Sequence, residues 1–164
     1  VLNKKDLVPE ADRSKVIEFI KRDNPSVSEV IYTNCKDINC SGLKSVLPRA
    51  TELLAESNRF HRESAPDSNI LIIGMPNVGK SSLINLVRNK KLKVAGKATA
   101  VGPKPGITRA VQTKIRICDD PLIYVLDTPG IMMPALKDMH MGMKLAACGN
   151  FLKLLNIFCA GNNR

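Results

Sequence analysis

The sequence predicts an α/β fold with a three-layer, Rossmann-like arrangement of helices around a mostly parallel sheet. Three observations support this class. Strand-like and helix-like segments alternate along the chain, the apolar run 70–73 is typical of a strand buried on both faces, and a glycine-rich loop and a helix follow that run directly. The 164 residues suffice for one domain with a single core.

Residues 1–57 are predicted to form the first half of this domain. Residues 1–7 are typical of the end of a buried strand running into a polar loop, and a helix follows them. Residues 27–33 predict a strand, and residues 41–56 predict a helix that Pro48 should kink or divide. The side chains expected to face inward are Val16, Phe19 and Ile20 on the first helix and Leu43, Val46, Leu47, Leu53 and Leu54 on the second.

Residues 58–69 are polar, contain Pro66 and lack a hydrophobic period, so they are predicted to link two halves of the domain. The second half covers residues 70–150, and residues 151–164 form a divergent tail. Within the second half we expect a strand at 70–73, a helix through Leu83, Ile84, Leu86 and Val87, an antiparallel edge pair at 111–117 and 122–126, and a helix at 137–154.

Charge and composition narrow the class of partner. The net charge is +10, and every charged residue from Arg88 to Arg116 is basic, which indicates a surface that faces a polyanion. The alternative is a solvated basic loop and strand face. Aromatic residues make up 4% of the chain and Trp is absent, which argues against a base-stacking platform. The five cysteines form no CxxC pair that would suggest zinc, and no apolar run is long enough to span a bilayer.

The strongest motif is Gly74–Ser81, which fits G-x-x-x-x-G-K-[ST] between an apolar strand and a helix. Its glycines let backbone N–H groups point at phosphates, and the helix N-terminus adds partial positive charge. We expect Lys80 to contact the β and γ phosphates and the Ser81 hydroxyl to bind Mg²⁺. The predicted contacts of this loop with a nucleotide are Asn77, Val78, Gly79, Lys80, Ser81 and Ser82.

Two segments downstream complete the predicted phosphate site. Asp127 begins the sequence DTPG at the end of an apolar strand, where ligands of α/β sheets bind, and is expected to hold Mg²⁺ through water. Gly130 is expected to donate its N–H to the γ phosphate. Thr108, in the loop GPKPGITR, is positioned in the sequence to supply a second hydroxyl ligand. The predicted metal site is therefore Ser81, Thr108 and Asp127.

A short motif near the start of the chain predicts the base that is bound. Asn3, Lys4 and Asp6 fit N-K-x-D. A carboxylate at Asp6 can accept both N–H groups on the Watson–Crick edge of guanine, whereas adenine would leave it poorly paired. Hydrogen-bonding sites of this kind can reject the wrong partner by about 10⁴ or more. Guanine is therefore preferred over adenine.

Taken together, NKKD, then Thr33-Asn34-Cys35, then GMPNVGKSS, PGITR and DTPG resemble the five GTPase motifs in the order four, five, one, two, three. That order is the mark of circularly permuted GTPases. Over residues 1–150 the chain is similar to the mitochondrial ribosome-associated GTPase 1 family and its bacterial relatives. The segments that carry this resemblance are GMPNVGKSSLIN, GKATAVGPKPGITRAV and YVLDTPGIMMP. The resemblance thus implies that the fold is a circularly permuted P-loop GTPase core.

The resemblance implies a function and a site. It implies GTP and GDP as ligands, Mg²⁺ as cofactor, and contacts to the nucleotide from Thr33, Asn34 and Cys35. It also implies a catalytic set of Lys80, Thr108 and Asn77, with Asn77 helping to hold K⁺; the alternative is that Asn77 only caps the loop. Ile131 stands where other GTPases carry a water-orienting glutamine, so intrinsic hydrolysis should be slow.

The resemblance further implies partners and a location. The expected partner is the large ribosomal subunit with its rRNA, which would stimulate hydrolysis, in the mitochondrial matrix or at the matrix face of the inner membrane. No transmembrane segment is expected, and peripheral membrane association is left open. Compared with the family, a strand, a helix and part of a strand are expected before Val1, and a helical RNA-binding domain is expected after the core, so truncation at both ends is expected.

Two alternative functions remain at this stage. A fragment or isoform could dock on RNA through residues 88–116 without hydrolysing GTP. A GTPase of tRNA modification or iron transport could share the asparagine-bearing loop, but the permuted motif order counts against it.

Overall fold

The computed structural model describes residues 1–57, 67–98 and 114–130. The chain separates into two compact units, residues 1–65 and residues 66–164. The predicted helix at 137–154 and the tail 151–164 lie outside the described residues, as do the first residues of the strand predicted at 111–117 and most of the predicted linker.

The first unit is mainly helical. It contains the short 3₁₀ helix η1 (Lys5–Leu7), α1 (Glu10–Asp23) and α2 (Ser41–Glu56). Residues 1–7 are predicted to hold the end of a strand that runs into a loop, and residues 27–33 a strand. The two segments meet in an isolated parallel bridge between Leu2 and Tyr32, and the described residues there form no regular strand. The chain turns away from the bridge at Lys4, whose φ of 60° lies in the left-handed region and ends the extended run.

The helix predicted at 41–56 is confirmed. Pro48, predicted to kink or divide it, does not divide it. α2 continues from Ser41 to Glu56 with Pro48 inside it. Both Pro48 and Lys44, whose carbonyl loses its helical donor to the proline, are exposed, so water can replace the missing N–H. Pro48 therefore costs one helical hydrogen bond on the wetted side of α2.

The helix predicted around Val16 is also confirmed, as α1, but Phe19 is not inward. α1 contains no buried residue, and 55% of Phe19 is exposed. The guanidinium carbon of Arg22, one turn away, lies 5.3 Å from the Phe19 ring centroid, so the ring is partly covered by a cation instead of by a core.

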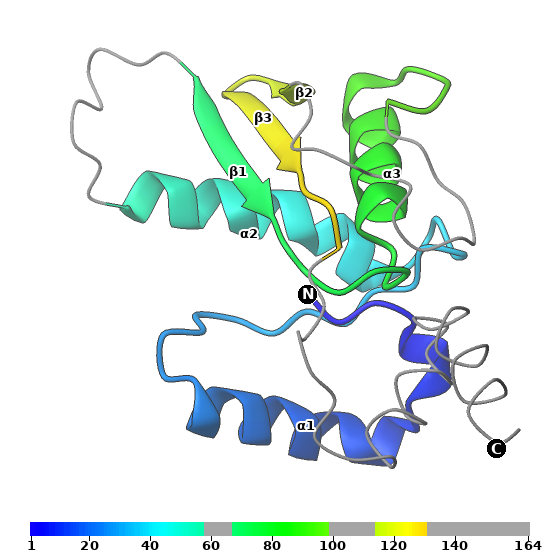
Figure 1. Cartoon of the computed structure of the whole chain (residues 1–164), viewed down its shortest axis with the longest axis vertical. Helices are drawn as coiled ribbons and strands as arrows, with labels where there is room; N and C mark the ends of the chain where they lie inside the picture. The colour runs from blue at the N-terminus through cyan, green and yellow to red at the C-terminus, as the bar shows by residue number, and fades with distance from the viewer. Residues whose placement is uncertain (58–66, 99–113, 131–164) are drawn as a thin grey trace, which may run out of the picture. The chain divides into compact units, whose positions relative to one another are not determined.

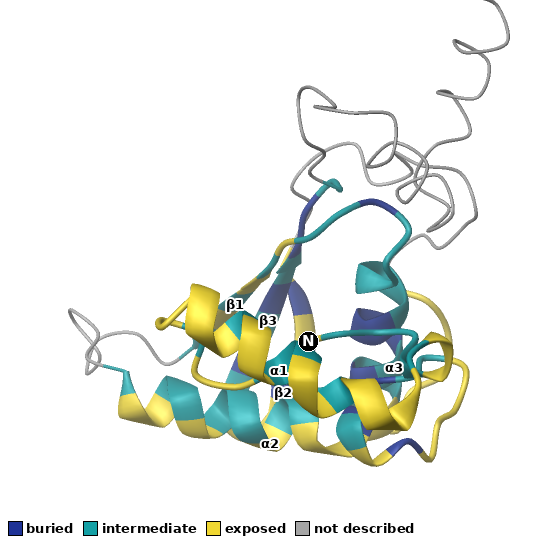
Figure 2. Cartoon of the chain, turned by 90° about the horizontal axis from the view of Figure 1, so that it is seen from below, coloured by how far each residue is buried: buried dark blue, intermediate teal, exposed yellow. Residues whose placement is uncertain are grey.

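The second unit contains a three-stranded sheet in the order β1-β3-β2 (Figure 1). β1 (Ser68–Ile72) pairs in parallel with β3 (Leu122–Asp127), and β2 (Ile115–Asp119) pairs with β3 in antiparallel fashion, which confirms the predicted edge pair. α3 (Lys80–Leu92) packs against β2 and β3. Buried positions gather on α3 and these two strands (Figure 2), led by Ile84, Ile117, Ile123 and Val125.

β1 is not buried on both faces, contrary to the sequence prediction. Its side chains alternate between half-buried and exposed, and Leu71 and, just beyond the strand, Ile73 are 57% and 63% exposed. β1 is an edge strand of this sheet, while α3 packs on β2 and β3. No helix among the described residues is long and apolar enough to cross a membrane.

Candidate functional site

The candidate phosphate site lies at the carboxyl edge of the sheet in the second unit. β1 and β3 are parallel, and Ile72 is paired in register with Asp127. The loop that leaves β1 and the loop that leaves β3 therefore begin side by side. In α/β sheets this is the edge at which ligands bind.

The loop after β1 has the backbone that its glycines and asparagine allow. Asn77 has φ 55° and Gly79 has φ 102°, both in the left-handed region. α3 begins directly after Gly79, whose carbonyl accepts the N–H of Leu83 at 2.9 Å. Asparagine enters the left-handed region more readily than most residues, so Asn77 suits this loop conformation. The role of Asn77 toward K⁺ stays a prediction.

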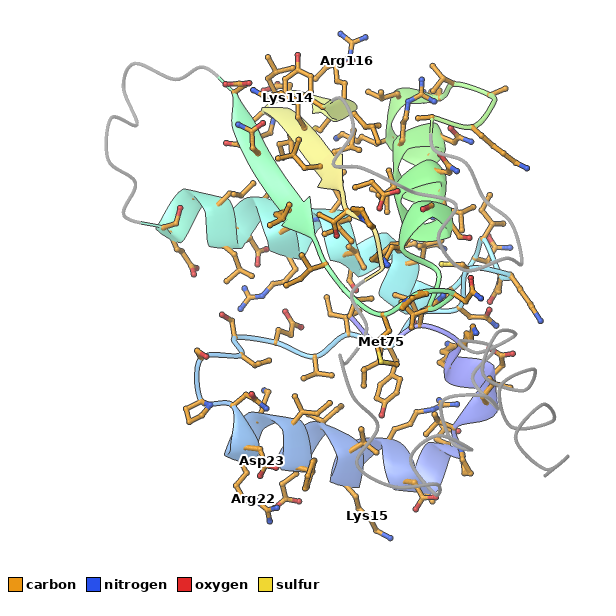
Figure 3. All side chains as sticks on the ribbon, in the orientation of Figure 1. Lys15, Arg22, Asp23, Met75, Lys114 and Arg116 are labelled. Carbon is orange, nitrogen blue, oxygen red and sulfur yellow. The ribbon has the colours of Figure 1, made fainter. Side chains whose placement is uncertain are left out.

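Lys80 lies folded back over this loop. Its Nζ donates hydrogen bonds to the carbonyl oxygens of Gly74, at 3.0 Å, and Met75, at 2.9 Å, the latter residue labelled in Figure 3. Burial lowers the pKa of Lys80 below 10.5, and the negative charge of Asp127 opposes that shift. An anionic ligand near the ammonium would remove the cost of burying this charge.

Ser81 and Asp127 meet at the start of α3 and the end of β3. The Ser81 hydroxyl donates to Oδ2 of Asp127 at 2.8 Å. The carboxylate is 1% exposed, and its Oδ1 has no hydrogen-bond partner among the described residues. A buried carboxylate with an unpaired oxygen beside a hydroxyl is a hard-oxygen donor set of the kind that Mg²⁺ prefers. These two residues fit the predicted metal.

The loop after β3 packs tightly on the loop after β1. The Thr128 hydroxyl donates to the carbonyl of Ile72 at 2.7 Å and so fastens the ends of β3 and β1 together. A Cβ placed on Gly130 would lie 2.6 Å from the backbone nitrogen of Pro76. Only glycine fits at this contact without displacing the phosphate loop.

In the first unit, Asn3 joins the two predicted base-recognition segments. Its Oδ1 accepts hydrogen bonds from the Cys35 N–H, at 3.2 Å, and from the Thr33 hydroxyl, at 3.3 Å. Thr33 is fully buried, and its carbonyl accepts the N–H of Lys5 at 3.0 Å. Asn3 and Thr33 therefore hold the N-K-x-D loop and the segment 33–35 against each other.

Asp6 differs from these supporting residues. It lies in η1, is exposed, and makes no hydrogen bond or ion pair with other described residues, so its carboxylate is open to a ligand. Lys4 provides the left-handed turn before η1. Asn34 accepts the N–H of Lys36 through its side chain at 3.0 Å. Burial raises the pKa of the Cys35 thiol to about 11, so this side chain is neutral at physiological pH.

The predicted site residues that the structure describes form two separate groups. The residues of the phosphate site lie in the second unit, and the residues predicted to recognise the base lie in the first. Val78 and Ser82 are half-buried around the start of α3. Thr108 and Ile131 lie outside the described residues. Sequence reasoning missed Thr128 and Pro76; the only signal for both was their place inside the two motifs.

Most of the second unit matches a known protein family. Residues 69–158 match the model of the family described as "50S ribosome-binding GTPase". The chain is 46% identical to "Mitochondrial GTPase 1" of Aedes aegypti over 146 residues, which is 89% of this chain and 46% of that protein. It is 46% identical to "Mitochondrial ribosome-associated GTPase 1" of Bos taurus over 153 residues, which is 93% of this chain and 44% of that protein.

A bacterial relative is more distant. "Ribosome biogenesis GTPase A" of Bacillus licheniformis is 37% identical over 117 residues, covering 68% of this chain and 38% of that protein. The chain therefore spans less than half the length of these curated relatives.

Proposed function

Because this chain belongs to the 50S ribosome-binding GTPase family, we propose that it is the core of a Mg²⁺-dependent switch that binds and hydrolyses GTP during assembly of the mitochondrial large ribosomal subunit. The observation that carries the proposal is the pairing of Ser81 with the buried Asp127 beside the phosphate loop. The names of the relatives, which include mitochondrial and ribosome-associated GTPases, support the location and the partner.

The phosphates are bound by the loop 74–79 and by Lys80. The loop amides and the start of α3 offer partial positive charge, and the Lys80 ammonium exchanges its two carbonyl acceptors for phosphate oxygens. Since these donors are fixed before the reaction, they stabilise charge that develops on the phosphates at little reorganisation cost. Gly130 is proposed to donate its backbone N–H to the γ phosphate, and Thr108 is proposed as a second hydroxyl ligand of Mg²⁺.

Mg²⁺ would be held by Ser81 and Asp127, and when bound it neutralises negative charge on the phosphate oxygens. The Ser81 hydroxyl and the Asp127 carboxylate hold each other in position through their 2.8 Å hydrogen bond. Asn77 is proposed to help hold K⁺. No side chain of the described phosphate loop is an obvious general base, which supports slow hydrolysis until the ribosomal partner is bound.

Guanine is selected by the first unit. The exposed Asp6 carboxylate accepts the two N–H groups of the base, while Asn3 and Thr33 hold the two recognition segments in place. The N–H groups of Thr33 and Cys35 already donate to the Leu2 carbonyl and to Asn3, so they hold the segment 33–35 in place beside the base. Adenine offers neither the paired donors nor the carbonyl.

The proposal is tested by titrating the chain with a fluorescent GTP analogue in Mg²⁺ buffer, with K⁺ or Na⁺, and competing with GTP, GDP, ATP and xanthosine triphosphate. GTP and GDP should displace the probe and ATP should not. Asp6→Asn should transfer the preference to xanthosine triphosphate, because an amide donates where the carboxylate accepted. Lys36→Gln, an exposed change in the same unit, is the matched control.

Turnover is then measured with and without isolated large ribosomal subunits. Stimulation of hydrolysis by large but not small subunits is expected. Equal displacement by ATP would refute guanine selection. Guanine binding with no turnover in the presence of large subunits would support the non-hydrolysing RNA-binding alternative instead.

A further inference from the structure

A cluster of lysines lies at the end of α3 far from the phosphate loop. We name it the α3 basic turn, and it consists of Lys90, Lys91, Lys93 and Lys97, all of them exposed. α3 has 13 residues, so at 1.5 Å per residue the turn is about 20 Å from the loop at the other end of the helix. The sequence from Gly74 to Ile117 contains no Asp or Glu.

The side chains of two asparagines on α3 make hydrogen bonds to the backbone of this turn. Lys93 ends α3 in a left-handed conformation with φ 52°, and the chain then doubles back along the helix (Figure 1). Asn89 donates through Nδ2 to the carbonyl of Gly96 at 2.9 Å. Asn85, which is 7% exposed, accepts the N–H of Ala98 at 2.9 Å. These bonds bring the lysines of the loop next to those of the helix.

Two basic residues of β2 and its approach are paired with acids. Lys114 contacts Asp67 at 3.0 Å, and Arg116 contacts Asp119 at 3.3 Å, near the labelled positions in Figure 3. In contrast, three members of the basic turn make no ion pair with any described residue: Lys91, Lys93 and Lys97. The partial negative charge of a helix C-terminus favours one or two cations but does not account for a loop that adds two more.

The chemistry of the turn fits a phosphodiester backbone. Lysine acts as a flexible point charge toward phosphate, whereas arginine and aromatic residues are the usual readers of base edges and base faces. The sequence between Gly74 and Ile123 contains no aromatic residue. The turn can therefore contact phosphates but has no side chain on which a base could stack.

We propose that the α3 basic turn binds the phosphate backbone of a structured RNA without reading its sequence. This inference rests on the proposed function, since it supplies a surface for the RNA of the ribosomal partner. The contact lies at the opposite end of α3 from the nucleotide, so it adds affinity for RNA without taking part in nucleotide binding.

The test uses the whole chain and a fluorescein-labelled, mixed-sequence RNA hairpin, with anisotropy titrations at several KCl concentrations. The triple variant Lys91→Gln, Lys93→Gln, Lys97→Gln should bind the RNA at least about tenfold more weakly. The plot of log association constant against log salt should become less steep, its negative slope shrinking in magnitude by about two to three. The control removes three exposed lysines of the first unit, Lys15, Lys21 and Lys44, and should stay within about twofold of the unmodified chain.

Separate measurements distinguish the other outcomes. Equal RNA affinity of the triple variant and the unmodified chain would overturn the inference. So would a variant that loses binding to phosphatidylcholine vesicles containing cardiolipin but keeps RNA binding, since the turn would then be a membrane contact. The triple variant should retain its affinity for the GTP analogue. If the unmodified chain bound no GTP while the lysine dependence of RNA binding held, the proposed function alone would fail.

Discussion

Asn3 accepts a hydrogen bond from the backbone N–H of Cys35 at 3.2 Å, although the two residues are 32 positions apart in the chain. The same oxygen, Oδ1, also accepts the Thr33 hydroxyl at 3.3 Å. The first residue of N-K-x-D thus supports the geometry of the loop that presents Asp6, and only Asp6 has an exposed carboxylate there.

Asn3→Ala should loosen this support and lower nucleotide affinity. It removes two hydrogen bonds, each contributing about 1 kcal/mol, so the Cys35 amide should exchange its hydrogen at least about tenfold faster. Hydrogen exchange followed by mass spectrometry measures this. Asn39→Ala, at an exposed position of the same unit, is the control. Unchanged exchange at Cys35 would show that the segment 33–35 is held by other contacts.

Asp127→Asn should remove most of the effect of Mg²⁺ on GTP affinity. The carboxylate is buried against Ser81, and the amide that replaces it has no negative charge to attract Mg²⁺. We expect the ratio of affinities with Mg²⁺ and with EDTA to fall by about tenfold or more. Asp119→Asn, an exposed acid of β2, is the control. The idea fails if the variant keeps the full Mg²⁺ effect.

Gly130→Ala should displace the phosphate loop, because its Cβ would meet the backbone of Pro76 at 2.6 Å. Overpacking of this kind costs about 1–3 kcal/mol, so weaker GTP binding and a lower Tm are both expected. Gly96→Ala is an informative comparison, since Gly96 has φ 104° but open space around it. It should lower Tm through backbone strain and leave GTP affinity unchanged. Equal GTP affinities for both variants would contradict the steric explanation.

Lys80→Met should abolish GTP binding and change how stability depends on pH. Burial lowers the folded-state pKa of Lys80 below 10.5, so the unfolded chain binds more protons between the two pKa values. The cost of burying the charged lysine is therefore present at neutral pH and disappears as pH rises through 10.5. The Tm of the variant minus that of the unmodified chain should fall between pH 8 and pH 11, as measured by thermal melts without nucleotide. A difference that stays constant or rises would reject this assignment.

Local sequence was enough to predict several elements. The helix 41–56, the helix after the phosphate loop and the antiparallel pair of β2 and β3 are confirmed, because hydrophobic period and glycine-rich turns act over a few neighbouring residues. The same local patterns misled at Pro48 and at Leu71. A helix tolerates proline where water can reach the freed carbonyl, and burial of a strand depends on its neighbours in the sheet.

The sequence by itself therefore determined the motif chemistry: a loop that turns at Asn77 and Gly79, and a lysine and a serine at the start of a helix. The motifs also predicted that Ser81 and Asp127 share a metal site, but only the tertiary structure decided how such distant groups meet. The parallel register of β1 and β3 places Asp127 against Ser81, 46 positions away, and seats Gly130 on Pro76. Such contacts depend on sheet order and register, which are set by packing across the whole unit, and no periodicity within a short window encodes them.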